Sequence, residues 1–322
     1  GSMRQFDAES YLDGFSGTVW WPCGGGPSAA AQEASGNYRP LNNYGADCAD
    51  SNRITASKDE VYRVTAEWAV SEDLMVYSSW GEGYRPGGLN RFCSVGNTAD
   101  YGGQGRDDAT GAQCDFTPDF LTSYEVGIKA TLMDGRMQVN AAAFLQDWDN
   151  FQFSRLDTSI SPVTLTYNIG QAKSDGFEAD FSVMLTETWS LSGAGSYIQA
   201  ELSQDYYASD GLAAPTAANG TQLPRVPEVK WNLSTRYGFN TDWFVQASYI
   251  YTGSSYNNLF DGGSIPTRRY KQEDYQILNA SIGVDRDSWV AEMYVRNLTD
   301  ERGEVFRNAV NWDERVMTNR PR

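Results

Sequence analysis

Histidine is missing from the chain altogether. Ser-His-Asp and Cys-His catalysis, His-ligated zinc and the H-E-x-x-H helix all need an imidazole, so these chemistries are excluded. Basic residues are also few, because 25 lysines and arginines stand against 42 aspartates and glutamates, for a net charge of −17. That balance argues against nucleic acid as a partner, since a phosphate backbone binds to basic surfaces. Carboxylate-only hydrolysis stays open, but so many acidic residues single out no catalytic pair.

Long apolar runs are missing as well, and no stretch approaches the roughly 18 residues of a transmembrane helix. A membrane β-barrel needs no such run, because only every second residue of its strands faces lipid. The chain is instead rich in aromatic residues (13%, including 10 Trp and 19 Tyr) and contains 31 glycines. These proportions are typical of β structure with many turns. The 322 residues suffice for two ordinary domains or one large β architecture.

Apolar and polar residues alternate along much of the chain, which is the period of a strand with two different faces. In segments 124–132, 177–185 and 229–239 one face is apolar and the other carries charged and polar side chains. Short polar turns are expected at 71–73, 133–136, 186–188, 240–242 and 285–288. Long loops are expected at 15–60, 87–118, 156–165, 203–225, 256–273 and 300–316. We therefore expect about 11 strands and the start of another, paired as hairpins that are tight at one end only.

Tryptophans mark the short-turn end of these hairpins. Trp189, Trp243 and Trp289 each follow a short turn directly, and Trp68 just precedes one. Aromatic rings at one level form a girdle at a membrane interface, where the ring lies in the apolar boundary and the N–H stays hydrated. A soluble β-sandwich would explain the alternation alone. The girdle and the asymmetry of the connections favour a transmembrane barrel.

Several segments resemble, in order, motifs of TonB-dependent outer-membrane receptors. Residues 74–91, "LMVYSSWGEGYRPGGLNR", resemble the family strand that closes in Y-x-S-x-G-[FY]-R-P-G-G-x-N, and residues 122–152 resemble the hairpin that follows it. Residues 168–185, with their Gly-Phe-Glu step, resemble the next strand. The last hairpin is matched by "YQILNASIGV" and "VRNLTDERG", and the start of the terminal strand by "NRPR". The resemblance runs from about residue 4 to residue 322.

The resemblance implies an all-β fold, namely an antiparallel up-and-down transmembrane β-barrel. Residues 4–322 would supply about 12 C-terminal strands of a 22-stranded barrel without its plug, and residues 1–3 are interpreted as a cloning scar. It implies a location in the bacterial outer membrane and no enzymatic activity, cofactor or metal site. The full-length form would import a ferric siderophore, cobalamin or an oligosaccharide. Its partners would be outer-membrane lipid, lipopolysaccharide and the TonB complex, the last acting through the missing plug segment.

The stretch Gly-Tyr-Arg-Pro-Gly-Gly is interpreted as the end of a strand and the start of an external loop. A phosphate-binding loop is excluded, because Pro86 stands where G-x-G-x-x-G needs its third glycine and no helical pattern follows. Pro86 also lacks the N–H that a ladder needs, and the glycines after it permit a sharp departure. Candidate cargo contacts lie in the loops: Trp20, Trp21, Tyr38, Tyr44, Tyr84, Arg85 and Asn90. Exposed aromatic and polar groups suit flat organic ligands or sugars, although Trp20 and Trp21 can equally pack against neighbouring loops.

All four cysteines lie in the expected loops. The simplest of three possible connectivities is Cys23–Cys48 with Cys93–Cys114, and the alternative is free thiols. Each bridge would stabilise the fold by roughly 3 kcal/mol in the chain-entropy model and would imply an oxidising compartment. An acidic loop beside the second pair offers oxygen ligands for calcium, but it lacks EF-hand spacing and resembles a solvated loop. Its members are Asp107, Asp108 and Asp115.

Two other classes of function remain open on the sequence. A secreted soluble β protein that binds or hydrolyses carbohydrate would share the alternation, but it would need no detergent. A passive porin-like barrel closed on these strands alone would share the apolar outer face. The incomplete final strand and the family resemblance argue against the porin.

Overall fold

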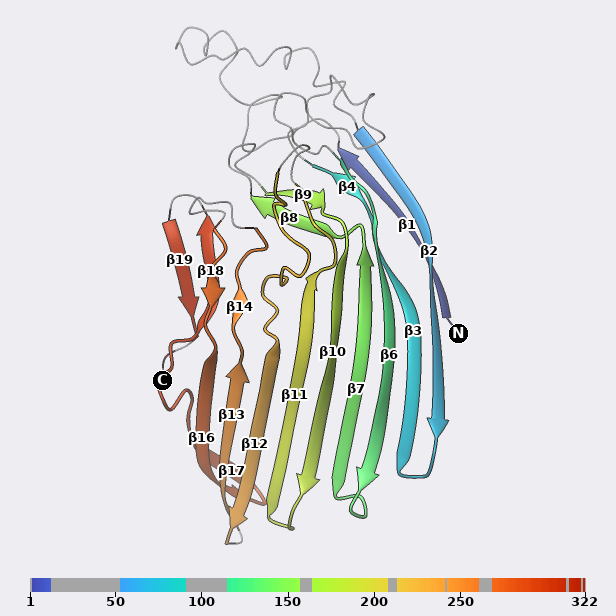
Figure 1. Cartoon of the computed structure of the whole chain (residues 1–322). Coiled ribbons are helices and arrows are strands. Elements are labelled where there is room, and N and C mark those ends of the chain that lie inside the picture. The colour runs from blue at the N-terminus through green and yellow to red at the C-terminus, as the bar shows by residue number, and fades with distance from the viewer. Residues whose placement is uncertain are drawn as a thin grey trace.

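The computed structural model describes residues 2–12, 53–90, 115–156, 164–207, 213–240, 242–260, 268–310, 313–319 and 321. Its main feature is an 11-stranded antiparallel sheet in the order β1-β2-β3-β6-β7-β10-β11-β12-β13-β16-β17 (Figure 1). Each of these strands pairs with the next one along the chain, apart from short hairpins inserted between them. The prediction of an all-β, antiparallel, up-and-down sheet is therefore confirmed. In the described part of the chain no helix is long and apolar enough to cross a membrane.

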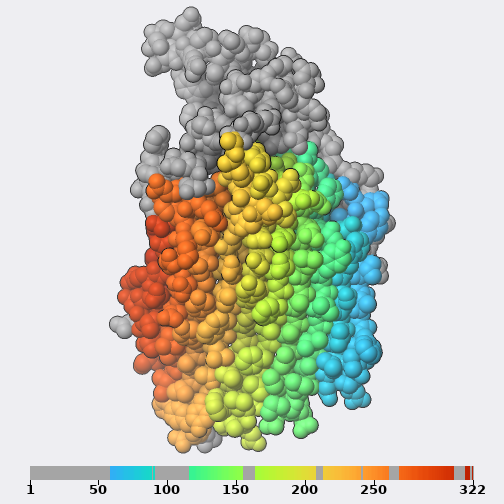
Figure 2. All heavy atoms as spheres, viewed as in Figure 1, coloured from blue at the N-terminus to red at the C-terminus, as the bar shows by residue number. Residues whose placement is uncertain are grey.

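The strands of the main sheet are mostly 10 residues or longer. They are β1 (Ser2–Leu12), β2 (Arg53–Ala69), β3 (Leu74–Arg85), β6 (Asp119–Leu132), β7 (Met137–Asp149), β10 (Ala172–Met184), β11 (Trp189–Leu202), β12 (Val229–Phe239), β13 (Trp243–Thr252), β16 (Tyr275–Arg286) and β17 (Trp289–Val295). About ten residues suffice for a tilted strand to span a bilayer, so most of these strands are long enough. Figure 2 shows the coloured part of the wall as a continuous surface, with the colours following one another in chain order.

The two ends of the sheet differ as the sequence predicted, with short turns at one end and long connections at the other (Figure 1). In the turn at 133–136 the backbone is left-handed at Asp134 (φ 55°) and Gly135 (φ 86°), a conformation that aspartate and glycine tolerate. Asn240 (φ 58°) does the same in the turn before β13.

In the described parts of the chain, the long connections contain four small hairpins, which satisfy backbone groups that a bare loop would leave unpaired. They are β4 (Gly88–Leu89) with β5 (Asp115–Phe116), β8 (Gln152–Leu156) with β9 (Thr164–Asn168), β14 (Ser255–Tyr256) with β15 (Lys271–Gln272), and β18 (Glu304–Val310) with β19 (Asp313–Thr318). Two of the loops predicted from the sequence are shorter in the structure than expected. Strand β2 begins at Arg53, inside the expected loop 15–60, because it pairs with β1 over its first residues. The expected loop 300–316 is largely the β18–β19 hairpin.

The strand register divides the main sheet into two faces, because residues directly opposite on neighbouring strands point the same way. We call one of these the outer face and the other the inner face. One row of residues on the outer face is Val76, Ile128, Ala141, Ala179, Gly195 and Trp231. The adjacent row, on the inner face, is Tyr77, Gly127, Ala142, Glu178, Ser196 and Lys230. The apolar faces predicted for 124–132, 177–185 and 229–239 all lie on the outer face.

The tryptophans predicted to form a girdle all lie on the outer face next to short turns. Trp68 is opposite Val76, Trp189 is opposite Tyr237, and Trp243 is opposite Val284. All four, including Trp289 at the start of β17, are exposed. The Trp189 indole Nε1 donates a hydrogen bond to Thr235 Oγ1 at 2.9 Å, so its polar atom is satisfied. The predicted placement is confirmed.

A buried hydrophobic cluster, which we call the mouth core, lies at the long-loop end. It joins residues around the β8–β9 hairpin to the end of β11 and to the connections that follow β11 and β13. Its members are Phe151, Leu165, Tyr167, Ile169, Ala172, Ala200, Leu202, Ala217, Leu223, Leu259 and Phe260. Ala172 and Leu202 are register partners on the inner face, so the mouth core packs against the inner side of the sheet.

Candidate functional site

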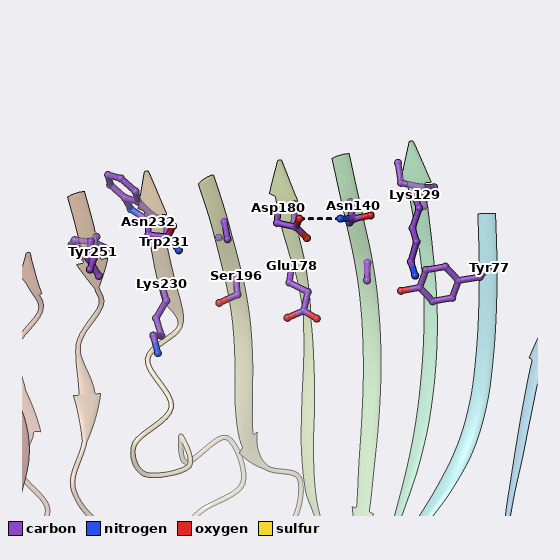
Figure 3. A pocket seen from close by; sticks show the side chains of 17 residues that line it. Tyr77, Lys129, Asn140, Glu178, Asp180, Ser196, Lys230, Trp231, Asn232 and Tyr251 are labelled. Atoms are coloured by element: carbon purple, nitrogen blue, oxygen red, sulfur yellow. Dashed lines mark hydrogen bonds between the residues drawn. The ribbon is translucent and has the colours of Figure 1, made fainter. Parts of the chain in front are cut away.

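A hollow of about 490 Å³ opens on the inner face between β3 and β13 (Figure 3). It exists because the short side chains Ala142, Ala194 and Ser196 stand beside longer polar ones on the neighbouring strands β10 and β12. Glu178 and Lys230 flank Ser196 in one row, two strand spacings or roughly 10 Å apart. The hollow is therefore an open recess in the wall, where charged side chains stand among small and apolar ones.

The lining of the hollow carries charges of both signs. Asp180 Oδ1 accepts a hydrogen bond from Asn140 Nδ2 at 2.9 Å, drawn as the dashed line in Figure 3. Lys129 Nζ lies 5.8 Å from the centre of the Tyr77 ring, within the range of a cation–π contact. Within the described ranges, no group of three or more Asp, Glu, His or Cys side chains is placed to hold a metal ion. The hollow suits contact with a polar or charged partner.

A second polar cluster, which we call the mouth clamp, lies where β3 ends and β6 begins. Arg85 and Asp119 are register partners on the inner face. Arg85 Nε lies 3.1 and 3.0 Å from the two carboxylate oxygens of Asp119, and Arg85 Nη2 pairs with Oδ2. The same Nη2 donates to the backbone carbonyl of Gln152 at 2.9 Å. This two-point pairing fixes the plane of the guanidinium.

Gln152 ties the clamp to the β8–β9 hairpin. Its backbone N–H donates to Asp119 Oδ2 at 3.0 Å, and its side-chain amide donates to the carbonyls of Pro86 (3.0 Å) and Thr117 (2.9 Å). Asp119 is only 1% exposed and Gln152 is buried. A buried carboxylate is tolerated because three donor atoms satisfy it.

Two asparagine side chains add further hydrogen bonds between the segments that the mouth clamp joins. Asn168 accepts from the Thr117 N–H at 2.8 Å and donates to the carbonyls of Thr117 and Asn150. Asn90 is buried and exchanges two hydrogen bonds with the backbone of Thr166, at 2.6 and 2.9 Å. These bonds hold the loop after β3, the start of β6 and the β8–β9 hairpin as one unit.

Three of the predicted cargo contacts lie among the described residues, and the structure places each of them differently. Arg85 lies on the inner face at the mouth. Asn90 lies nearby, but its side-chain amide contacts the Thr166 backbone. Tyr84 points the other way, because it is opposite Phe120 on the outer face, with ring centres 5.4 Å apart.

The remaining predicted residues are not covered by the structure. Trp20, Trp21, Tyr38 and Tyr44 lie outside the described residues, as do Asp107, Asp108 and the four cysteines of the predicted bridges Cys23–Cys48 and Cys93–Cys114. Asp115 is placed in β5, and its side chain is not described.

Asp119 and Gln152 were missed by the sequence reasoning, which treated Arg85 as a lone loop residue. The signal available was weak. Asp119 directly precedes an alternating segment, and the chain contains many other acidic residues.

An antiparallel meander with an apolar outer face, a polar inner face, a girdle at the short-turn end and structured loops at the other end defines the wall of an outer-membrane β-barrel. Residues 32–298 match the TonB dependent receptor-like β-barrel, and the chain belongs to this family. The family is one of receptors rather than enzymes, and it places the chain in the bacterial outer membrane.

The relatives support this assignment. The chain is 24% identical over 273 residues to a probable TonB-dependent siderophore receptor, PiuA, of Acinetobacter baumannii, covering 84% of this chain and 33% of PiuA. It is 30% identical over 208 residues to the metal-pseudopaline receptor CntO of Pseudomonas aeruginosa, covering 57% of this chain and 27% of CntO. The crystal structure of PiuA from A. baumannii superposes with a TM-score of 0.63 at 18% identity, covering 87% of this chain and 37% of that one. The chain thus spans about a third of the length of these relatives.

Proposed function

We propose that the chain forms part of the wall and mouth of an outer-membrane receptor that imports a ferric siderophore with energy from TonB. The observation that carries the proposal is the two-faced sheet itself, with lipid-type residues on the outer face and a hollow with charged side chains and the mouth clamp on the inner face. This is the arrangement that a water-filled or plugged path through a membrane needs. The family match and the names of the relatives, a siderophore receptor and a metal-pseudopaline receptor, support iron or metal chelates as the cargo.

The proposed partners follow from the two faces. The outer face would contact outer-membrane lipid, and the connections at the mouth would meet lipopolysaccharide. In the described sheet, β1 and β17 form the edges. Unpaired strand edges are costly in hydrocarbon, so further strands would close the barrel. The TonB complex would act through a plug segment outside this chain.

The residues that we propose to contact cargo are the candidates from the sequence that face the mouth. Arg85 has the geometry for this role, and Trp20, Trp21, Tyr38 and Tyr44 remain predictions. The bridges Cys23–Cys48 and Cys93–Cys114 are proposed to stiffen the same loops. Cobalamin and oligosaccharides gain no support from the relatives' names, so we do not propose them as cargo.

The proposal is tested by deleting the gene of the full-length receptor from the bacterium that carries it. We expect loss of radioactive iron uptake from a ferric tris-catecholate or a ferric tris-hydroxamate complex, restored by the wild-type gene. Uptake should also stop when a protonophore collapses the energy supply of the TonB complex. Uptake that survives the protonophore would support a passive porin. Loss of cobalamin or maltodextrin uptake with normal iron uptake would overturn the proposed cargo.

A further inference from the structure

Arg85 is paired with a buried carboxylate and is itself partly exposed. It is locked in place by Asp119, which is 1% exposed, yet 49% of the Arg85 side chain remains exposed. Breaking a pair whose anchor is buried is costly, because the buried charge loses its partner. The anchor here is buried, while part of the Arg85 side chain stays accessible at the mouth.

The hydrogen bonds of Arg85 leave one edge of the guanidinium open. A guanidinium has five N–H donors. Those on Nε and Nη2 are directed to Asp119 and to the Gln152 carbonyl. Nη1 donates no hydrogen bond to any residue that the structure describes. The Phe151 ring, 5.8 Å from Arg85 Cζ, supports the face of the group.

The mouth clamp fixes the orientation of the guanidinium, and with it the direction of Nη1. Asp119 belongs to β6 and Gln152 to β8, so the guanidinium plane is set by two elements of the mouth. Gln152 is itself fixed by the carbonyls of Pro86 and Thr117. A guanidinium held in this way loses little conformational entropy when it binds an oxyanion.

We propose that the Nη1 edge of Arg85 binds an anionic oxygen of the cargo, such as a catecholate or carboxylate oxygen of a ferric chelate, and that Asp119 and Gln152 are positioning residues. The inference rests on the proposed function and deepens it. It assigns the receptor a preference for anionic over neutral ferric complexes at the mouth.

The test measures binding of two probes to the full-length receptor in detergent, by quenching of tryptophan fluorescence. The probes are an anionic ferric tris-catecholate and a neutral ferric tris-hydroxamate. We expect Arg85→Gln to weaken binding of the anionic probe by about 10- to 100-fold, the loss of one charge-assisted contact, and to leave the neutral probe unchanged. Arg85→Lys, which keeps the charge but not the fork, should fall between.

Two further variants test whether binding of the anionic probe depends on the orientation of Arg85 or only on the net charge of the inner face. Arg63→Gln removes an exposed cation from the same inner face, opposite Gly81, and should leave both affinities unchanged. Asp119→Asn removes a negative charge, so charge alone predicts tighter binding of the anionic probe, whereas loss of positioning predicts weaker binding. Heat-modifiable mobility on gels confirms that each variant is folded.

The outcomes distinguish failure of the Arg85 site from failure of the proposed cargo. Equal effects of Arg85→Gln on both probes, or no effect on either, would overturn the role of Arg85 and leave siderophore import standing. Tighter binding of the anionic probe by Asp119→Asn would overturn the positioning role. Failure of the wild-type receptor to bind either probe would overturn the proposed cargo and the Arg85 site together.

Discussion

In the wall of the sheet, Val126 and Phe177 are 52% and 57% exposed, whereas in the mouth core Leu165 and Leu202 are completely buried. Both regions are rich in apolar residues, but only the mouth buries them within the chain. The outer face of the wall therefore depends on lipid as its apolar solvent, and the mouth carries a core of the kind found in soluble proteins. One chain is thus stabilised by two different apolar media, lipid at the wall and its own side chains at the mouth.

The largest expected effect is in the mouth core. Leu165→Ala should lower the free energy of unfolding by about 2–5 kcal/mol, because a completely buried leucine leaves a cavity. Leu145→Ala on the exposed outer face is the matched control and should cost clearly less, since lipid fills the space. Urea unfolding of the full-length receptor in lipid vesicles measures both. Equal losses would mean that wall and mouth are packed alike.

A charge on the outer face should have the next largest effect. Leu233→Arg should cost about 2–4 kcal/mol of folding free energy in vesicles, because the guanidinium would face hydrocarbon. The neighbouring Asn232→Arg points to the inner face and should cost under about 1 kcal/mol, as for a surface change. The two variants differ by one position in β12. A larger loss for Asn232→Arg would reverse the assignment of the faces.

A smaller effect is expected where the wall packs within itself. Tyr77 lies across Gly127, and a Cβ at Gly127 would be 2.5 Å from the tyrosine ring. Gly127→Ala should therefore cost about 1–3 kcal/mol through overpacking. Gly81→Ala is the control, because its Cβ would lie 3.4 Å from the nearest atom, the Cγ of Arg63, which can yield slightly. If the two alanines have the same effect, Tyr77 does not pack on Gly127.

The two faces of the wall were predictable, because the alternation of side chains along a strand depends only on neighbouring residues in the sequence. Period-two alternation placed Val126, Phe177 and Leu233 on one face, and each lies there in the structure. The tryptophans beside short turns were predictable for the same reason. The alternation also fixes the direction of Tyr84, which has the parity of Val76 on β3, and applying it there would have separated Tyr84 from Arg85.

The mouth was less predictable because its contacts join residues far apart in the chain. Arg85 and Asp119 are 34 positions apart, and Asn90 reaches Thr166 over 76 positions. No local period links these residues, and an acidic chain offers many candidate partners for one arginine. The expected loop 156–165 covers only one end of each strand of the β8–β9 hairpin, and strands of five residues give too short an alternation to be predicted.

The outer face of this sheet should meet lipid, and the inner face should not. Spin labels placed singly at positions 231 to 236 of β12, in the full-length receptor in vesicles, test this through relaxation by lipid-dissolved oxygen. We expect strong relaxation at 231, 233 and 235 and weak relaxation at 232, 234 and 236, where a water-soluble nickel reagent should act more strongly. Weak relaxation by both reagents at 231, 233 and 235 would place these side chains in a protein core and contradict the account.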